Sequence, residues 1–407
     1  MKSLWDLTAS AKGGLFAGFS SAAKSSALAG LWTFPSIVGG SFLIAWAAES
    51  AQFFMSQGLS LAILAWVQVL PEFAVEAVIA WQAPRTPHGM ALVSANFTGA
   101  VRLLVGLGWP MIYAVAAFFH RKKHHRPLRE IRLEDEHSVE VVGLILPILY
   151  FCVIVLKGTL TVWDGAVLMV IYVAYMFILN RIPPKELEKP EDEEWPIRKI
   201  VTMKPAARNT TIAALFIGGA VIIYFTAEPF LHSLLAMALS LGISQFVFVQ
   251  WVAPFLSEFP EKLSAFYWAR KVTGAPMALM NMVSSNINQW TMLAAMIPIV
   301  VAISAGHIQP IPLDHEQRIE FALTIAQSAL GMCLLANLSF AWHEAIVLFS
   351  LWLAQFLVPG LREEVAVLYG VWVAYEVVAW LMKFRKPAAF PAFARLFKER
   401  VMGRRRA

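Results

Sequence analysis

The sequence predicts an all-α polytopic membrane protein with two inverted five-helix repeats and one extra C-terminal transmembrane helix. Its 407 residues are 58% hydrophobic and 15% charged, with a mean hydropathy of +0.62. Soluble domains are about 45–50% apolar and roughly 25% charged. Apolar stretches of about 20 residues, the length of a membrane-spanning helix, recur from end to end. Related stretches also recur in the same order in the two halves of the chain.

The apolar stretches indicate eleven spans, arranged as five, five and one. Polar or charged residues separate most of them, and Gly106, Gly108 and Pro110 predict a break in the third helix. The predicted spans are 28–55, 59–82, 88–119, 138–157, 161–180, 210–238, 242–268, 275–302, 316–337, 340–358 and 365–383.

The segments divide the chain into five parts. Residues 1–27 are expected to lie at the membrane interface, because they lack the short apolar core and cleavage site of a signal peptide. The repeats would occupy 28–180 and 210–358, joined by a cytoplasmic linker, 181–209, that is rich in Pro and mixed charge. Residues 359–407 would hold the extra span and a basic cytoplasmic tail.

Lys and Arg concentrate in the connections that this topology places on one side. By the positive-inside rule that side is cytoplasmic, which puts the N-terminus outside and the C-terminus inside. The expected location is a prokaryotic inner membrane. The net charge of +6 then indicates orientation rather than nucleic-acid binding. The tail, basic with interleaved Phe and Leu, either contacts anionic lipid or serves only as a topological anchor.

Two Pro-Glu pairs, Pro71-Glu72 and Pro260-Glu261, lie deep within apolar spans. A carboxylate at membrane depth is costly and indicates function, and a neighbouring proline frees backbone carbonyls by breaking the helix. Each half has an odd number of spans, so the second repeat is inverted relative to the first. Inverted repeats place a binding site near the membrane midplane, between broken helices.

These features together resemble the cation/calcium antiporter superfamily, which includes the sodium/calcium exchangers. The Pro-Glu pairs stand where that family has G-T-S-x-P-E, and residues 91–102 and 278–289 stand where it has A-L-G-N-x-x-G-S-N-I-F-N/D, with several positions changed. The G-x-L-x-x-W-D-G run at 158–165 is similar to the start of the family's fifth helix. The resemblance implies a secondary antiporter of calcium, sodium or protons that works by alternating access, without a cofactor and without enzyme activity.

The resemblance also implies the site residues. Glu72 and Glu261 would be the paired acidic metal ligands. Glu258 is the alternative in the second repeat, because L-P-E-F around Glu72 also matches L-S-E-F around Glu258. Neutral oxygens would come from other motif positions: Gln68, Ser257, Asn286 and Gln289. Four further acids lie outside the motifs: Glu49 and Glu228 are expected at interfacial or access positions, and Asp164 and Glu344 are expected to be structural residues at helix starts.

Arg102 stands where the family has an Asn or Asp ligand. Arginine is permanently charged and cannot bind a cation, so at membrane depth it is expected to pair with an acid. The expected partner is Glu72, with Glu76, Glu258 and Glu261 as others. Three interpretations stay open. Arg102 is a tethered cation replacing sodium, or it adapts the cavity to an anionic or zwitterionic substrate, or it locks the carboxylates of a protein that no longer transports.

The rival function is a non-transporting membrane scaffold or sensor, and an intramembrane enzyme is more distant. The sequence has no H-E-x-x-H motif, P-loop or G-x-G-x-x-G stretch, which argues against a zinc protease and an ATP-driven pump. Cys152 and Cys333 lie in apolar runs and indicate neither a disulfide framework nor a metal cluster. The partners expected are therefore the lipid bilayer and the transported ions.

Overall fold

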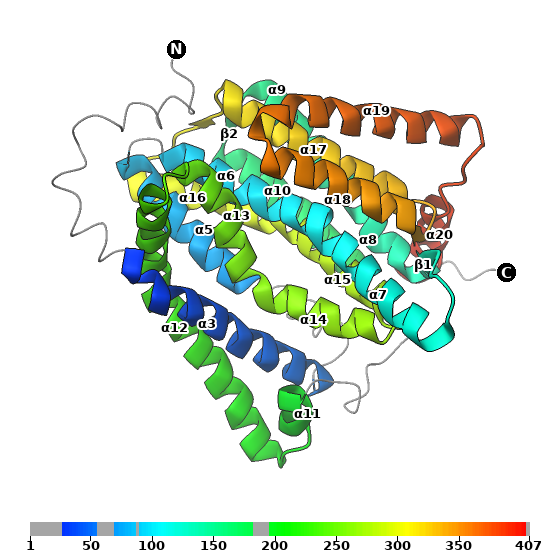
Figure 1. Ribbon diagram of the computed structural model, residues 1–407, viewed down its shortest axis with the longest axis horizontal. Helices are drawn as coiled ribbons and strands as arrows, with labels where there is room; N and C mark the ends of the chain where they lie inside the picture. Colours follow the sequence, from blue (N-terminus) through cyan, green and yellow to red (C-terminus); the bar gives the residue numbers. More distant parts are fainter. Residues whose placement is uncertain (1–26, 55–68, 87–88, 182–194, 404–407) are drawn as a thin grey trace.

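The computed structural model describes residues 27–54, 69–86, 89–181 and 195–403, which form a bundle of long helices (Figure 1). Within these residues, eight helical spans are long and apolar enough to cross a membrane, and two further apolar helices are shorter. The predicted all-α membrane fold is confirmed. Most of the segment 1–27 and the first part of the expected span 59–82 lie outside the described residues.

The helices of the first half are α3 (Gly30–Ala51), α5 (Leu70–Gln82), α6 (Gly89–Leu103), α7 (Trp109–His124), α8 (Ser138–Gly143), α9 (Ile145–Lys157) and α10 (Val162–Leu179). Those that follow are α11 (Trp195–Val201), α12 (Pro205–Ser240), α13 (Gln245–Ser257), α14 (Phe259–Arg270), α15 (Ala275–Asn288), α16 (Ala294–Ala305), α17 (His315–Leu335), α18 (Trp342–Leu357), α19 (Arg362–Leu381) and α20 (Ala389–Leu396). Three π-helical turns are η3 (Leu104–Gly108), η6 (Gln289–Leu293) and η8 (Phe397–Val401).

Two short antiparallel sheets reveal how the halves are related. β1 (Glu130–Arg132) links α7 to α8 and pairs with β4 (Ser339–Ala341), which links α17 to α18. β3 (Ile311–Pro312) links α16 to α17 and pairs with β2 (Thr159–Leu160), which links α9 to α10. Each sheet thus joins the link between the third and fourth spans of one half to the link between the fourth and fifth spans of the other half. Figure 1 places β1 and β2 at opposite ends of the bundle, as inverted repeats require.

One of the predicted helix breaks is absent, and another is present beside Pro260. The third span is not interrupted at Gly106–Pro110, because the π-helical turn η3 carries α6 continuously into α7. The seventh span does break, at Glu258, where α13 ends and α14 begins. The expected linker 181–209 contains the helix α11, and α12 begins at Pro205, before the predicted residue 210.

An aromatic cluster packs the halves together at the centre. Phe97 of α6 and Phe151 of α9 come from the first half, and Trp290 of η6 and Phe321 of α17 from the second. The ring centroids of Phe151 and Trp290 are 4.5 Å apart, and those of Phe97 and Phe321 are 5.7 Å apart. Aromatic pairs in stacked or edge-to-face geometry add to the packing energy, so this cluster helps to hold the two halves together.

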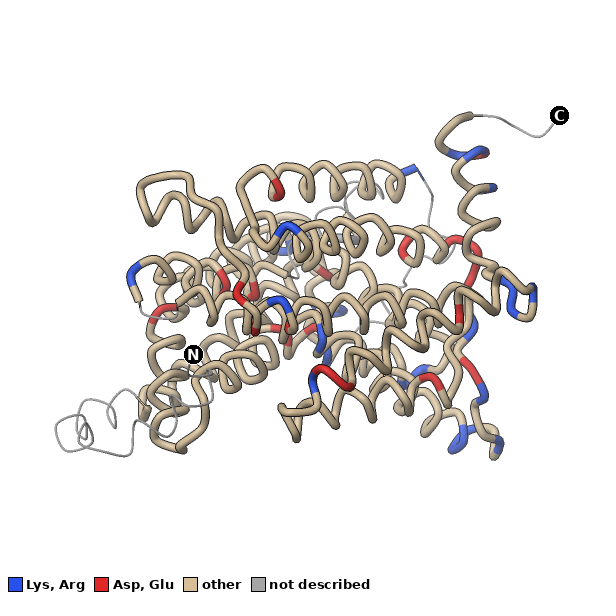
Figure 2. Tube along the Cα trace, turned by 90° about the horizontal axis from the view of Figure 1, so that it is seen from above, with Lys and Arg blue, Asp and Glu red and all other residues tan. Residues whose placement is uncertain are grey.

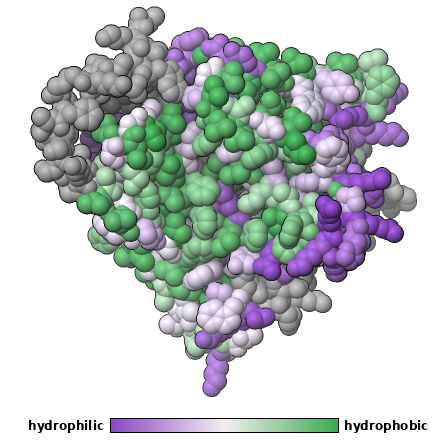
Figure 3. All heavy atoms as spheres, in the orientation of Figure 1, coloured by the Kyte–Doolittle hydropathy of each residue, from purple (hydrophilic) through white to green (hydrophobic). Residues whose placement is uncertain are grey.

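The outer helices expose apolar side chains rather than covering them. Leu149 of α9, Val170 of α10, Ile217 of α12 and Val371 of α19 are each more than half exposed. Figure 3 shows a broad hydrophobic face, with hydrophilic residues gathered toward one end. Exposed apolar surface of this extent is expected of helices that contact lipid.

The C-terminal tail packs against the bundle. Helix α20 contacts α8, and the backbone nitrogen of Ala389 donates to the carbonyl of Ala336 at 2.9 Å. Arg395 of α20 forms an ion pair with Asp135. Figure 2 shows Lys and Arg concentrated at the end of the molecule where the C-terminus lies.

Helix α6 crosses α13 so closely at Gly99 that no side chain fits. A Cβ atom there would lie 1.8 Å from the backbone oxygen of Gln250. We predict that Gly99→Ala lowers the stability of the detergent-purified protein by about 1–3 kcal/mol, the usual cost of overpacking. Gly218→Ala is the control, because a Cβ at Gly218 meets nothing within 4 Å. Thermal unfolding measures both, and equal midpoints would contradict the tight crossing.

Candidate functional site

Three side chains meet where helices of the two halves are interrupted. Glu72 lies in the first turn of α5, Glu258 at the break between α13 and α14, and Gln289 at the start of η6. The Gln289 Nε2 atom donates to Glu72 Oε1 and Oε2 at 3.0 and 3.1 Å, and to Glu258 Oε1 at 2.9 Å. All three residues are buried. One amide group therefore links a carboxylate of the first half to a carboxylate of the second.

A buried lysine completes this cluster. Lys262 Nζ forms an ion pair with Glu258 Oε2, and only 5% of Lys262 is exposed. The residues are four apart on α14, a spacing that brings side chains together on a helix. Sequence reasoning missed Lys262, although that spacing from Glu258 was a visible signal.

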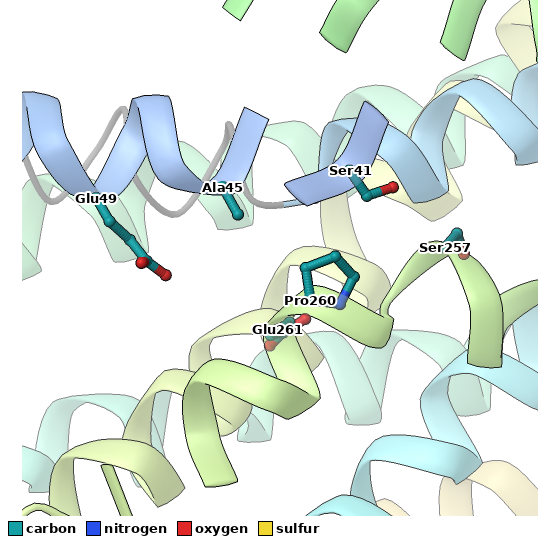
Figure 4. A pocket seen from close by; sticks show the side chains of 6 residues that line it. All are labelled: Ser41, Ala45, Glu49, Ser257, Pro260 and Glu261. Atoms are coloured by element: carbon teal, nitrogen blue, oxygen red, sulfur yellow. The ribbon is translucent and has the colours of Figure 1, made fainter. Parts of the chain in front are cut away.

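Glu261 lies beside the cluster and lines a small cavity between α3 and the α13–α14 junction (Figure 4). Ser285 hydrogen-bonds the Glu261 carboxylate, whereas Glu261 Oε1 has no hydrogen-bond partner within the described part of the chain. The Ser257 hydroxyl donates to the Ala253 carbonyl at 3.1 Å. The cavity is lined by Ser41, Ala45, Glu49, Ser257, Pro260 and Glu261.

The local sequence explains why the helices begin or deform here. Pro71 and Pro260 stand at the starts of α5 and α14, where the missing N–H of proline costs nothing. The positive ends of both helix dipoles then lie next to Glu72 and Glu261. A π-helical turn begins at Gln289, and such turns are frequent at functional sites.

Acceptor atoms outnumber donors in this cluster. Both oxygens of Glu72 share one amide group, while Gln289 Oε1 and Glu261 Oε1 have no hydrogen-bond partner among the described residues. Buried acceptors without donors are costly. Carboxylate and amide oxygens are the ligands of hard cations such as calcium, so the arrangement is suited to receive cations or protons.

Arg102 does not pair with Glu72, nor with Glu76, Glu258 or Glu261, and that prediction was wrong. Its Nη2 forms a buried ion pair with Glu320 of α17. Three further contacts hold it: Nη1 donates to Gln355 Oε1 at 2.9 Å, Nε donates to the Thr98 carbonyl at 3.2 Å, and the guanidinium lies over the Trp251 ring at 5.1 Å. The guanidinium is thus satisfied away from the Glu72–Glu258 cluster.

A second arginine shares Glu320. Arg362 Nη1, at the start of α19, forms an ion pair with Glu320 Oε1. Gln250 of α13 donates to Glu320 Oε2 at 2.9 Å and accepts from Arg362 at 3.2 Å. This network, which we call the Glu320 network, ties α6, α13, α17, α18 and α19 together. Sequence reasoning missed Glu320, and its position inside a predicted span, one turn beyond Glu316, was the available signal.

Other predicted residues lie apart from the cluster. Asn286 Nδ2 donates to the Val101 carbonyl of α6 at 3.4 Å, and Asn286 Oδ1 has no hydrogen-bond partner in the described ranges. Gln68 lies outside the described residues. Glu76, one turn after Glu72, accepts from Asn96 at 2.5 Å.

A larger cavity of ≈ 630 Å³ adjoins Glu49 on one side of the cluster. Glu49 lines both cavities, is 3% exposed, and accepts from Ser264 at 3.0 Å. Glu228, its counterpart in the sequence pattern, has a 66% exposed side chain and contacts Gln82 and His232. The two acids are therefore not equivalent. We call this larger cavity the vestibule, and its lining includes Trp46, Trp195, Trp268, Arg270 and Lys271.

Asp164 and Glu344 have the structural positions expected of them. Asp164 accepts from the backbone nitrogen of Thr161 at 2.7 Å, and Glu344 accepts from that of Ala341 at 2.7 Å, at the starts of α10 and α18. Lys157 also donates to Asp164, at 2.6 Å. Both acids thus cap helices that follow a strand.

Glu72 and Glu261 do not form a ready-made metal centre. Among the described residues, no group of three or more His, Cys, Asp or Glu side chains is arranged to hold a metal ion. In the contacts described above, Gln289 holds Glu72 and Glu258, and Lys262 holds Glu258.

Known proteins are similar to this one over most of the chain. The family described as "Sodium/calcium exchanger protein" matches residues 25–180 and 211–359. A crystal structure of the H+/Ca2+ exchanger CAX is similar at 31% identity, covers 97% of both chains, and has a TM-score of 0.84. No curated protein matches the chain in sequence.

Two more distant structures share the fold. The sodium-calcium exchanger NCX_Mj, soaked with Na+ and Sr2+, is 18% identical over 83% of this chain and 98% of its own, with a TM-score of 0.53. Native YfkE is 13% identical over 82% and 96% of the two chains, with a TM-score of 0.55.

The Glu320 network predicts a stability effect. Glu320→Gln leaves two buried guanidinium groups without a counter-charge, so we expect a loss of about 3–5 kcal/mol, typical of a broken buried ion pair. Thermal unfolding of the purified protein tests this. Glu316→Gln is the control, since Glu316 lies on the same helix and is only partly buried. A Glu320→Gln protein as stable as the control would show that the network contributes little.

Proposed function

This chain belongs to the sodium/calcium exchanger protein family, and we propose that it is a cation antiporter that exchanges calcium, sodium or protons by alternating access. The observation that carries the proposal is the excess of buried acceptors around Glu72, Glu258, Glu261 and Gln289. The 31% identity to a protein described as an H+/Ca2+ exchanger supports it. A non-transporting scaffold would have no use for unpaired acceptors at this depth.

Glu72 and Glu261 are the proposed ligands of the transported cation. Glu258 supplements them through its charge rather than as a ligand, because its two oxygens accept from Lys262 and Gln289. Gln289 turns its free Oε1 toward the cation while its Nε2 group holds Glu72 and Glu258. Ser257, Asn286 and Gln68 are the proposed neutral oxygens of the pathway. A carboxylate that releases a proton when the cation binds couples the two ions directly.

Access to the cluster runs through the vestibule in this proposal. Glu49 lines both the vestibule and the cavity that Glu261 lines, so it is placed to accept a cation on its way inward. Helices α3 and α12 pack along one another at one flank of the bundle (Figure 1). Sliding or rocking of this pair against α14 would close the cavity on one side and open it on the other.

Arg102 is a tethered cation in this proposal, but its counter-charge is Glu320. The family motif that the sequence resembles has an Asn or Asp ion ligand at the position of Arg102, and arginine cannot bind a cation. Its hydrogen bonds to Gln355 and Thr98 support a fixed role. The transported ion would then meet fewer ligands on the α6 side than on the η6 side.

We further propose that the basic end of the molecule is cytoplasmic. Lys and Arg are concentrated at the end that holds the C-terminus (Figure 2), as the positive-inside rule describes. In this proposal the protein lies in a prokaryotic inner membrane, its N-terminus is outside, and anionic lipid would meet the basic tail.

Purified protein in proteoliposomes should move cations when calcium, sodium and pH gradients are imposed in turn. We predict that Glu72→Gln and Glu261→Gln each reduce flux to the level of empty vesicles, because each removes a negative charge that the cation needs. Glu316→Gln, far from the cluster in sequence and partly exposed, is the control. If no gradient drives movement through the wild-type protein, the antiport proposal fails and the scaffold is favoured.

Glu49→Gln should weaken transport without abolishing it. Loss of the access carboxylate is expected to raise the apparent KM for the cation about three- to tenfold, equivalent to roughly 0.7–1.4 kcal/mol, with the maximal rate kept. Glu228→Gln is the matched control, because that acid is exposed and lines neither cavity. An unchanged KM in Glu49→Gln would place the access path elsewhere.

A further inference from the structure

Lys262 is a positive charge built into a cluster that otherwise accepts cations. Its ammonium group contacts Glu258 and lies within electrostatic range of Glu72 and Glu261. A buried ammonium group needs a paired carboxylate. Nothing in the proposed transport step requires a lysine here, so its presence calls for an explanation.

The contacts of Glu258 show what the lysine does. Glu258 Oε2 accepts from Lys262 and Oε1 accepts from Gln289, so both of its oxygens have donors. The acceptors that remain short of donors belong to Glu72, Glu261 and Gln289. Lys262 therefore satisfies one carboxylate and leaves the other two for the transported ion.

The charges of the cluster add to a definite value. Glu72, Glu258 and Glu261 supply three negative charges when ionised, and Lys262 supplies one positive charge. The net charge is two negative. One divalent cation, or two monovalent cations, neutralises it, and an uncompensated charge at this depth would be costly. Glu76 lies one turn further along α5 and is held by Asn96 instead.

We propose that Lys262 is a fixed counter-cation that sets the net charge of the cluster at two negative, so that one divalent cation exchanges for two monovalent cations without net charge movement. The inference rests on the proposed cation antiport. It assigns to Lys262 the control of how many charges cross the membrane in each cycle.

Membrane voltage distinguishes this proposal from a purely structural role. Proteoliposomes are loaded, the potential is clamped with potassium and valinomycin, and the calcium ratio reached at steady state is measured against a fixed pH or sodium gradient. The wild-type ratio should not change with voltage. Lys262→Gln removes the positive charge and makes the net charge of the cluster three negative. One divalent cation should then exchange for three monovalent cations, so each cycle should carry one net charge. The ratio should then change about tenfold for roughly 60 mV.

Three further variants complete the experiment. Lys262→Arg keeps the charge and should remain insensitive to voltage. The double variant Glu258→Gln with Lys262→Gln removes the pair together, keeps the net charge at two negative, and should also be insensitive, even where Lys262→Gln alone is inactive. Lys157→Gln is the control, since that lysine pairs with Asp164 at the start of α10.

Two results would overturn the proposal. One is a voltage-insensitive ratio in an active Lys262→Gln protein, and the other is a folded double variant without exchange. Both require a wild-type protein that transports, which separates them from failure of antiport itself, where the wild-type protein moves no cation under any gradient.

Discussion

The amide group of Gln289 is the contact on which the organisation of the centre depends. It lies between Glu72 of the first repeat and Glu258 of the second, at 3.0 and 2.9 Å. Without a donor between them, two carboxylates this close would repel at low dielectric. The π-helical turn that begins at Gln289 and the prolines that start α5 and α14 all serve to bring these three side chains together.

The two repeats are related in backbone and different in chemistry. Both have a π-helical turn in the third span, and both contribute to each small sheet. At matched positions, however, one repeat offers Gln289 to the carboxylates and the other turns Arg102 toward Glu320. The extra helix α19 supports this difference, because its first residue, Arg362, holds the other oxygen of Glu320. Helix α19, which lies outside the two repeats, thus contacts the same carboxylate as Arg102, the residue at which the two repeats differ.

Much of the fold followed from the sequence, because apolar length and duplicated motifs are local properties. The eleventh span and the helix starts at Pro71 and Pro260 could be predicted in this way. The partner of Arg102 could not, since Glu320 is 218 residues away in sequence and the duplicated motifs do not include it. The continuous π-turn at Gly106 was also beyond prediction, because glycine and proline permit several backbone solutions. The place of Lys262 in the cluster could have been predicted, because it follows Glu258 by four residues within the predicted span 242–268.

The Glu320 network and the cluster around Gln289 are both buried ionic groups, but they differ in how completely their polar atoms are paired. In the Glu320 network both carboxylate oxygens have cationic partners, and Gln250 and Gln355 add hydrogen bonds. Separating such a network leaves buried charges uncompensated, which is costly, so it is suited to holding five helices in place. Around Gln289 the balance is reversed, because buried acceptors remain without donors and a cavity adjoins Glu261. An incoming cation there replaces missing contacts rather than breaking existing ones. The Glu320 network is therefore suited to keep its contacts, whereas the cluster around Gln289 is completed by a ligand. Only the cluster around Gln289 is suited to exchange an ion.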